Sequence, residues 1–201
     1  MQATERAMRE AALRLMSERG YDATSTDDIA RAAGVSPRTF FNYFASKDAV
    51  VLLPEGIFLE LVTSALDARP AGEDPTAAVA AAIMGAFYQF DLLIGPDAAE
   101  LMRAQLRLMF AVPEVRRLTF DRRLKVEEVV WDRLRAHGVA AEDLSARAAV
   151  ATVMSLAFLG LTLWASGDDD EPLLAAIARC LLAAPHPSRL AAGVTAAPPV
   201  S

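Results

Sequence analysis

Apolar side chains recur every three to four positions along most of the chain, which is the spacing of one face of an α-helix. In residues 4–19, for example, Met8, Ala12 and Met16 fall on one face. No run alternates apolar and polar residues between turn signals, so the pattern gives no sign of a β-sheet. We therefore predict an all-α protein.

Capping and turn signals divide the chain into about nine helices. Serine and aspartate mark helix starts because their side chains accept hydrogen bonds from the first free backbone N–H groups, whereas glycine and proline mark helix ends. The helix that begins at Ser46 is expected to continue to about Ala68. The predicted starts lie near Thr4, Ser25, Ser36, Ser46, Asp74, Asp97, Pro113, Glu142 and Asp170.

Residues 25–44 carry the most specific local pattern. Ser25 followed by Asp28 predicts a capping box at the start of a short helix. Gly34 predicts a tight turn, and the dipeptide Ser36-Pro37 predicts the start of the next helix. Two short helices joined through a glycine form a helix-turn-helix arrangement.

The second helix of this pair, from residue 37, concentrates aromatic side chains. Phe40 and Phe44 are four residues apart, so they share a face and are predicted to pack into a core. Phe41 and Tyr43 are then predicted to point outward. The opposite face consists of Pro37, Arg38, Phe41 and Asn42.

This outward face suits the major groove of DNA. Arg38 offers a bidentate contact to guanine, Asn42 one to adenine, and Phe41 an apolar contact to a thymine methyl group. An exposed helix that uses Arg38 and Asn42 only for solubility is the alternative, but two exposed aromatic side chains favour a partner. Donors for backbone phosphates flank the face at Thr26, Thr39, Tyr43 and Lys47.

The segment "ALRLMSERGYDATSTDDIARAAGVSPRTFFNYFASKDAVV" strongly resembles the DNA-binding domain of the TetR family of transcriptional regulators. The resemblance covers about residues 7–52 and rests on "SERGY", "IARAAGVS" and "TFFNYFASKDAV" in register. It implies a homodimer that binds a palindromic operator on double-stranded DNA. It places the same eight side chains at phosphates and bases, with one departure: position 41 is often tyrosine in the family, and Phe41 lacks its hydroxyl.

The resemblance also implies the domain organisation. Residues 1–47 would form the DNA-binding domain and residues 48–184 a helical domain for effector binding and dimerisation. Composition, rather than the resemblance, predicts a disordered tail over residues 185–201, which are rich in proline, alanine and glycine. The uncharged run 148–167 has the length of a membrane span, but we expect a buried helix at a dimer interface. The interface residues expected are Ala151, Ser155, Leu159, Gly160 and Leu163.

In this layout an effector pocket would lie among the middle helices. Methionine and aromatic side chains make walls that tolerate varied apolar ligands, although most such residues are ordinary core. The basic run from Arg116 to Lys125 would suit an anionic ligand, but the solvated face of a long helix is the favoured interpretation. The expected pocket residues are Met84, Phe87, Tyr88, Asp91, Met102, Gln105, Met109, Trp131, Met154 and Phe158.

Composition narrows the functional classes. The net charge is −6, but residues 1–50 hold seven basic and seven acidic side chains, so the excess negative charge lies in the remainder. A single cysteine, Cys180, suits a reducing compartment, and the charged first twenty residues hold no apolar signal core, so we expect a cytoplasmic protein. Without a glycine-rich phosphate loop or a metal-ligand cluster, we expect no enzyme, no cofactor and no metal.

Two hypotheses follow. The first is a repressor released from its operator by a small, largely apolar effector. The second is a regulator or activator without an effector, whose C-terminal domain only dimerises. A void among the middle helices would favour the first, and a solidly packed core the second.

Overall fold

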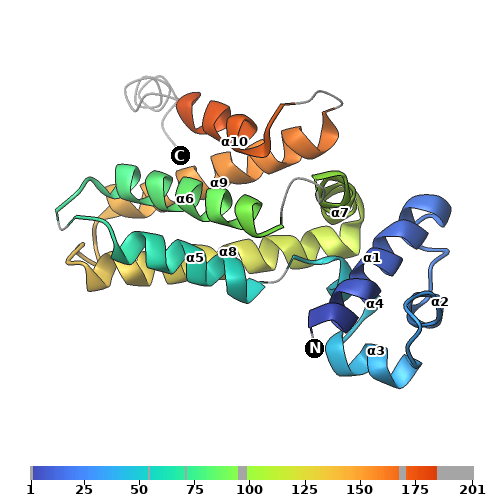
Figure 1. Ribbon diagram of the computed structural model, residues 1–201. Helices are drawn as coiled ribbons and strands as arrows, with labels where there is room; N and C mark the ends of the chain where they lie inside the picture. Colours follow the sequence, from blue (N-terminus) through green and yellow to red (C-terminus); the bar gives the residue numbers. More distant parts are fainter. Residues whose placement is uncertain (1, 54, 71, 95–98, 168–170, 185–201) are drawn as a thin grey trace, which may run out of the picture.

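A computed structural model describes residues 2–53, 55–70, 72–94, 99–167 and 171–184 of the chain (Figure 1). These residues form ten α-helices and no strand, which confirms the all-α prediction. The helices are α1 (Gln2–Arg19), α2 (Thr26–Ala32), α3 (Pro37–Tyr43), α4 (Lys47–Val51), α5 (Glu55–Asp67), α6 (Pro75–Ile94), α7 (Ala99–Ala111), α8 (Pro113–Ala136), α9 (Leu144–Ser166) and α10 (Leu173–Leu182).

The predicted nine helices become ten because the segment after Ser46 breaks. It was expected to continue unbroken to about Ala68, but α4 ends at Val51 and Leu52 is extended, with ψ at 142°. The sequence explains the break, since Pro54 follows and a proline disfavours helical backbone in the residue before it. The predicted starts at Asp97 and Asp170 and the predicted tail 185–201 lie outside the described residues.

Helices α1–α4 form an N-terminal lobe, seen at the lower right of Figure 1. Helix α1 packs against α2 and α4, and α2 packs against α3. The centre of this lobe is apolar and closed to solvent: Met8, Leu13, Ile29, Phe40 and Val50 are at most 1% exposed. Burial of these side chains stabilises helices that are too short to persist alone.

Helices α5–α10 form a C-terminal lobe. Helix α5 lies on α6 and α8, and α9 packs against α6, α7, α8 and α10. The two lobes meet where α1 and α4 contact α7 and where α4 contacts α8. The predicted boundary between residues 47 and 48 therefore falls inside α4, the helix that touches both lobes; the domain division stays a prediction.

Helix α9 holds the uncharged run that sequence analysis compared with a membrane span. Among the described helices, α9 is long and apolar enough to cross a membrane, and 44% of its apolar stretch is buried. One side of α9 packs inside the lobe and the other is exposed, so the expectation of a buried helix is met on one face only.

Candidate nucleic-acid interface and internal cavity

Side-chain caps fix the two short helices of the helix-turn-helix. The Ser25 hydroxyl accepts a hydrogen bond from Asp28 N at 3.1 Å, and the Asp28 carboxylate accepts from Ser25 N at 3.2 Å, which confirms the predicted capping box. Hydrogen bonds from the Ser25 side chain and backbone hold the pKa of Asp28 below its ordinary value. At α3, the Ser36 hydroxyl accepts from Thr39 N at 3.0 Å, as the Ser36-Pro37 signal predicts.

The turn between α2 and α3 depends on a left-handed residue. Gly34 has a φ of +69°, a conformation that side-chain-bearing residues rarely adopt. The chain then closes back on α2, where Val35 N donates to Ala30 O at 2.9 Å. This geometry holds α3 at a fixed angle to α2.

The inward face of α3 is as predicted. Phe40 is fully buried, Phe44 is 4% exposed, and their ring centroids lie 5.5 Å apart. The guanidinium of Arg9, from α1, lies 5.0 Å from the centre of the Phe44 ring. These contacts anchor α3 to the lobe by one face and leave the other free.

The outward face of α3 presents the residues proposed to read bases. Pro37, Arg38, Phe41 and Asn42 are all exposed, and Phe41, at 54%, is a large apolar side chain in water. Tyr43 differs from the expectation: it is half-buried and packs against the core of the lobe, because its position on the helix turns it toward α1–α4 rather than fully outward.

The four side chains predicted at phosphates lie on α3 and on the neighbouring helices α2 and α4, and all four are half-buried. Thr26 and Thr39 are half-buried, and the Thr39 hydroxyl lies 2.8 Å from that of Ser36. Lys47 Nζ donates to Tyr21 O at 2.9 Å and lies 4.0 Å from the centre of the Tyr21 ring. Phosphate contacts by these residues stay predictions.

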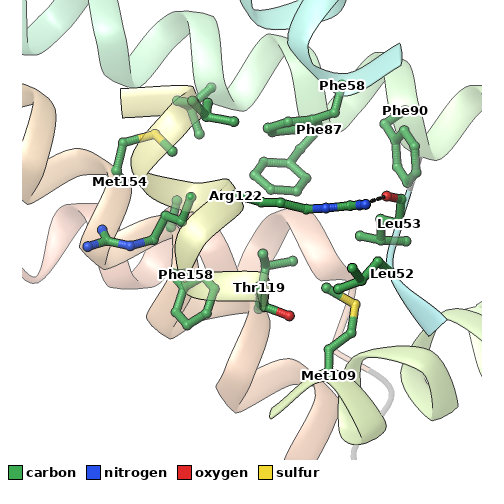
Figure 2. A pocket seen from close by; sticks show the side chains of 15 residues that line it. Leu52, Leu53, Phe58, Phe87, Phe90, Met109, Thr119, Arg122, Met154 and Phe158 are labelled. Carbon is green, nitrogen blue, oxygen red and sulfur yellow. Dashed lines mark hydrogen bonds between the residues drawn. The ribbon is translucent and has the colours of Figure 1, made fainter. Parts of the chain in front are cut away.

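The C-terminal lobe contains a partly open apolar cavity of about 130 Å³ (Figure 2). Well-packed cores leave few voids larger than one water molecule, whose share of liquid volume is about 30 Å³. Helices α5 to α9 and the α4–α5 connection contribute the wall. The lining residues are Leu52, Leu53, Phe58, Ile83, Phe87, Phe90, Met109, Thr119, Arg122, Arg123, Val126, Met154, Ala157, Phe158 and Leu161.

Four of the ten predicted pocket residues line this cavity, and six do not. Those that line it are Phe87, Met109, Met154 and Phe158. Tyr88 and Asp91 lie on the exposed side of α6, and Met84 is half-buried outside the cavity. Met102, Gln105 and Trp131 are buried elsewhere in the core. The sequence identified the helices, but not which face of each one meets the void.

Three polar side chains in the cavity wall were missed. Thr119 is satisfied within its own helix, since its hydroxyl donates to Val115 O at 2.8 Å. Arg122 and Arg123 belong to the basic run that sequence analysis assigned to a solvated face, and for these two residues that interpretation is wrong. Arg122 Nη1 donates to the carbonyl of Leu53 at 2.8 Å.

Arg123 is paired with an acid. Its Nη1 lies 2.6 Å from Glu127 Oε1 and donates to the Ser155 hydroxyl at 3.2 Å. Burial raises the pKa of Glu127 above its ordinary value, and the charges of Arg123 and Arg147 oppose that rise. The Glu127 carboxylate therefore balances the charge of Arg123 within the cavity wall.

The end of α4 and the α4–α5 connection are held by side chains from both lobes. Arg9 donates to the carbonyls of Val50 and Leu52, and Gln105 Nε2 donates to Val51 O at 2.7 Å. With Arg122 on Leu53, each carbonyl from residue 50 to residue 53 accepts a side-chain donor. These bonds supply partners that the end of a short helix cannot supply for itself.

The predicted dimer-interface residues divide into two groups. Ala151, Ser155, Leu159 and Leu163 are exposed along one side of α9. Gly160, by contrast, is buried inside the chain, where a Cβ would lie 2.7 Å from Ile177 Cα of α10. Its lack of a side chain serves the packing of α9 on α10, so Gly160 does not belong to the exposed face.

A second cavity lies between α5, α6 and α8, near His137. The His137 imidazole is 3.3 Å from the Asp67 carboxylate, and Arg69 pairs with Glu73 at the same end of the lobe. Among the described residues, no group of three or more His, Cys, Asp or Glu side chains is placed to hold a metal ion.

Comparisons with known proteins agree on one kind of protein. Residues 9–53 match the family described as bacterial regulatory proteins, tetR family. The HTH-type transcriptional regulator TcmR of Streptomyces glaucescens is 41% identical over 105 residues, which are 51% of this chain and 46% of that protein. The match therefore spans less than half the length of this curated relative.

Two solved structures share the architecture of nearly the whole chain. FadR of Thermus thermophilus, described as a TetR family transcriptional repressor in complex with lauroyl-CoA, is 25% identical with a TM-score of 0.50, over 89% of this chain and 91% of that one. The fatty acid degradation regulator FadR of Bacillus halodurans is 20% identical with a TM-score of 0.55, over 89% and 93% of the two chains, and shows the fold alone.

Proposed function

The chain belongs to the TetR family of DNA-binding transcriptional regulators, and from this premise we propose that it is a repressor released from its operator by a small, largely apolar effector. The observation that carries the effector part is the cavity of about 130 Å³ whose wall includes Leu52 and Leu53. These two residues follow α4, the last helix of the N-terminal lobe, and lead into α5 of the C-terminal lobe.

We propose that α3 reads the operator in the major groove. Its exposed face offers Arg38 to guanine, Asn42 to adenine and Phe41 to a thymine methyl group, with Pro37 beside them. Thr26 and Thr39 lie in the first turns of α2 and α3, and the N-terminal ends of helices attract phosphates, which supports phosphate contacts there. Tyr43 and Lys47 would complete the phosphate contacts, and Lys47 would turn away from Tyr21 to do so.

We propose that the exposed side of α9 pairs with a second copy of the chain. The stripe consists of small and apolar side chains over more than five helical turns and carries no charge from Ala148 to Ser166. Such a face is costly in water and typical of the buried core of a homodimer interface. Two copies would then present two recognition helices to a palindromic operator.

The effector would act through the α4–α5 connection. A palindromic operator requires recognition helices about one helical turn apart, roughly 34–36 Å. A ligand changes this separation only if it binds one spacing better than the other. A ligand in this cavity would contact Leu52 and Leu53 directly, and these residues follow α4 without an intervening helix.

A regulator without an effector is the alternative, but it would need no void in this lobe. The cavity favours the repressor hypothesis, as does the Thermus FadR structure, that of a repressor in complex with lauroyl-CoA. Because lauroyl-CoA carries an apolar chain, compounds with an apolar chain are the first candidates to test as effectors.

Selection from random DNA followed by a ligand screen tests the proposal. The purified protein should select a palindromic sequence, and an apolar compound that raises its melting temperature should release that DNA. Leu159→Lys should dissociate the dimer in sedimentation experiments, whereas Leu92→Lys, at an exposed leucine on α6, should not. Selection of a non-palindromic site by a monomer would overturn the dimeric repressor.

A further inference from the structure

We propose that the surface which receives the second copy of the chain spans two helices, α8 and α9, and that Phe120 and Leu124 of α8 belong to it together with Leu159 and Leu163 of α9. The inference rests on the proposed dimer and specifies its contact surface. All four side chains are between 42% and 50% exposed. Single exposed apolar side chains are normal on a protein surface, whereas a contiguous group of them marks a contact site.

The spacing of these residues places them in two stripes. Phe120 and Leu124 are four residues apart and share one face of α8, as Leu159 and Leu163 share one face of α9. The outer faces of two helices therefore carry the same kind of exposed side chain.

Two contacts across the seam between α8 and α9 join these stripes into one surface. The Phe120 ring lies 5.1 Å from the ring of Phe158, the residue before Leu159, measured between centroids. Arg123 Nη1 donates to the Ser155 hydroxyl at 3.2 Å. Positions 120 and 123 thus meet positions 158 and 155, so the two helices run antiparallel and side by side. The exposed stripe of α9 continues onto α8 without a gap.

The area that a stable dimer requires is larger than α9 alone can offer. Helix α9 has 23 residues, so it is about 35 Å long and about 10 Å wide. One face of it covers roughly 350 Å² in projection, whereas a stable interface buries about 800 Å² on each partner. The 24-residue helix α8 beside it raises the projected surface to about 700 Å².

Helix α10 also packs against α9, but its exposed side chains suit an interface core less well. They include Arg179, which pairs with Glu171 at 2.9 Å, and charged residues are depleted at the cores of interfaces. Leu182, an exposed leucine of α10, is the last residue of that helix. On α8 the exposed Arg117 and Asp121 instead flank an apolar pair that contains an aromatic ring, which is the pattern of a polar rim around an apolar core.

Sedimentation equilibrium of the purified full chain tests this surface. Phe120→Lys and Leu124→Lys should each weaken the dimer at least about tenfold, because each would place an unpaired charge in the interface core. Leu92→Lys makes the matched change at an exposed leucine of α6 and should leave the dimer unchanged. Far-UV circular dichroism of every variant checks that the helices are intact.

A thiol at position 124 tests the same surface without a disruptive charge. Leu124→Cys should react with a maleimide more slowly above the dimer dissociation constant than below it, because the partner covers this position. Leu92→Cys should react at the same rate at both concentrations. The native Cys180 is buried and contributes little to the signal.

A dimer as tight as that of the wild type in either lysine variant, or equal reactivity of Leu124→Cys at both concentrations, would overturn the assignment. Dissociation by Leu182→Lys but not by Phe120→Lys would also overturn it and would place the second helix of the interface at α10. In each of these cases, dissociation by Leu159→Lys shows that the proposed dimer itself stands. A wild-type chain that sediments as a monomer at all concentrations would overturn the dimer and this surface together.

Discussion

The two lobes place phenylalanine side chains in opposite ways. In the N-terminal lobe, Phe40 and Phe44 are packed against each other and against neighbouring helices, with Phe40 wholly buried. In the C-terminal lobe, the Phe58 ring pairs with those of Phe87 and Phe90, and all three line a cavity. Aromatic rings are thus used in one lobe to fix a helix and in the other to surround a void.

The difference matches two physical requirements. A helix that reads bases must be held at a fixed angle. The inward face of α3 is therefore packed into the core, and side chains cap the starts of both α2 and α3. A lobe that senses a ligand must leave room for it and must gain stability when the room is filled. The end of α4, held by Arg9 from one lobe and Gln105 from the other, leads into the α4–α5 connection that joins the two.

Truncating one phenylalanine in each lobe should give the largest difference. Phe40→Ala should reduce the free energy of unfolding by roughly 3–5 kcal/mol, because it opens a cavity in a filled core. Phe87→Ala should cost at least about 1 kcal/mol less, because one side of this ring already lacks contacts. Denaturant unfolding of both variants measures the difference, and equal losses would show that the C-terminal cavity is filled in solution.

The packing of α9 on α10 can be tested with two glycines of the C-terminal lobe. Gly160→Ala should destabilise the protein by roughly 1–3 kcal/mol, because the new Cβ meets the backbone of Ile177 at 2.7 Å. Gly85→Ala, inside α6, should stabilise it by about 0.5–1 kcal/mol, since its Cβ would meet Ala65 Cβ at an ordinary 4.0 Å. Thermal unfolding compares the two, and the same sign for both would refute close packing at Gly160.

Base reading should be confined to the N-terminal lobe. Arg38→Ala should weaken binding to the selected operator by roughly 1–3 kcal/mol and relax the preference at one base pair. Arg117→Ala, at an exposed arginine of the C-terminal lobe, should leave the preference unchanged. Competition between operator variants and random DNA checks this, and an equal loss on operator and random DNA would argue against base reading by Arg38.

The smallest expected effect concerns the cap of α2. Because hydrogen bonds from Ser25 lower the pKa of folded Asp28, its ionised form contributes stability above the unfolded value of 3.8, and this contribution is lost as the pH falls through the lower folded value. The stability difference between wild type and Asp28→Asn should therefore shrink from about pH 6 to about pH 3. Asp27→Asn, outside the capping box, is the matched control, and a constant difference for Asp28→Asn would contradict the ionic cap.

The sequence was most informative where the determinants are local. The capping box of Ser25, the turn at Gly34 and the inward pair Phe40 and Phe44 depend on neighbours within four residues, and the structure has all of them. Tyr43 was less well predicted, because a side chain at the edge of a helical face can turn to either side, and here it packs on the lobe.

The cavity could be predicted only in outline, because its wall combines single faces of five helices. Tyr88 and Phe87 are adjacent in sequence, yet one is exposed and the other lines the void. Arg122 belongs to a charged run whose pattern fits solvent, and its contact with Leu53 joins residues 69 positions apart. The break after α4 is a local feature that Pro54 signals directly. The expectation of one continuous helix from Ser46 to about Ala68 did not take this proline into account.

The central claim, that filling this cavity releases operator DNA, is tested most directly by titrating a cavity ligand against operator-bound protein and following DNA anisotropy. The comparison is between the wild type and Ala157→Phe, which places a large side chain at a wall position that is 4% exposed. We predict that the ligand lowers the operator affinity of the wild type at least about tenfold. This requires the ligand to bind the released protein at least about tenfold more tightly than the operator-bound protein. Ala157→Phe should lose this response to the ligand. A ligand that raises the melting temperature of the wild type but leaves its operator affinity unchanged would contradict the claim.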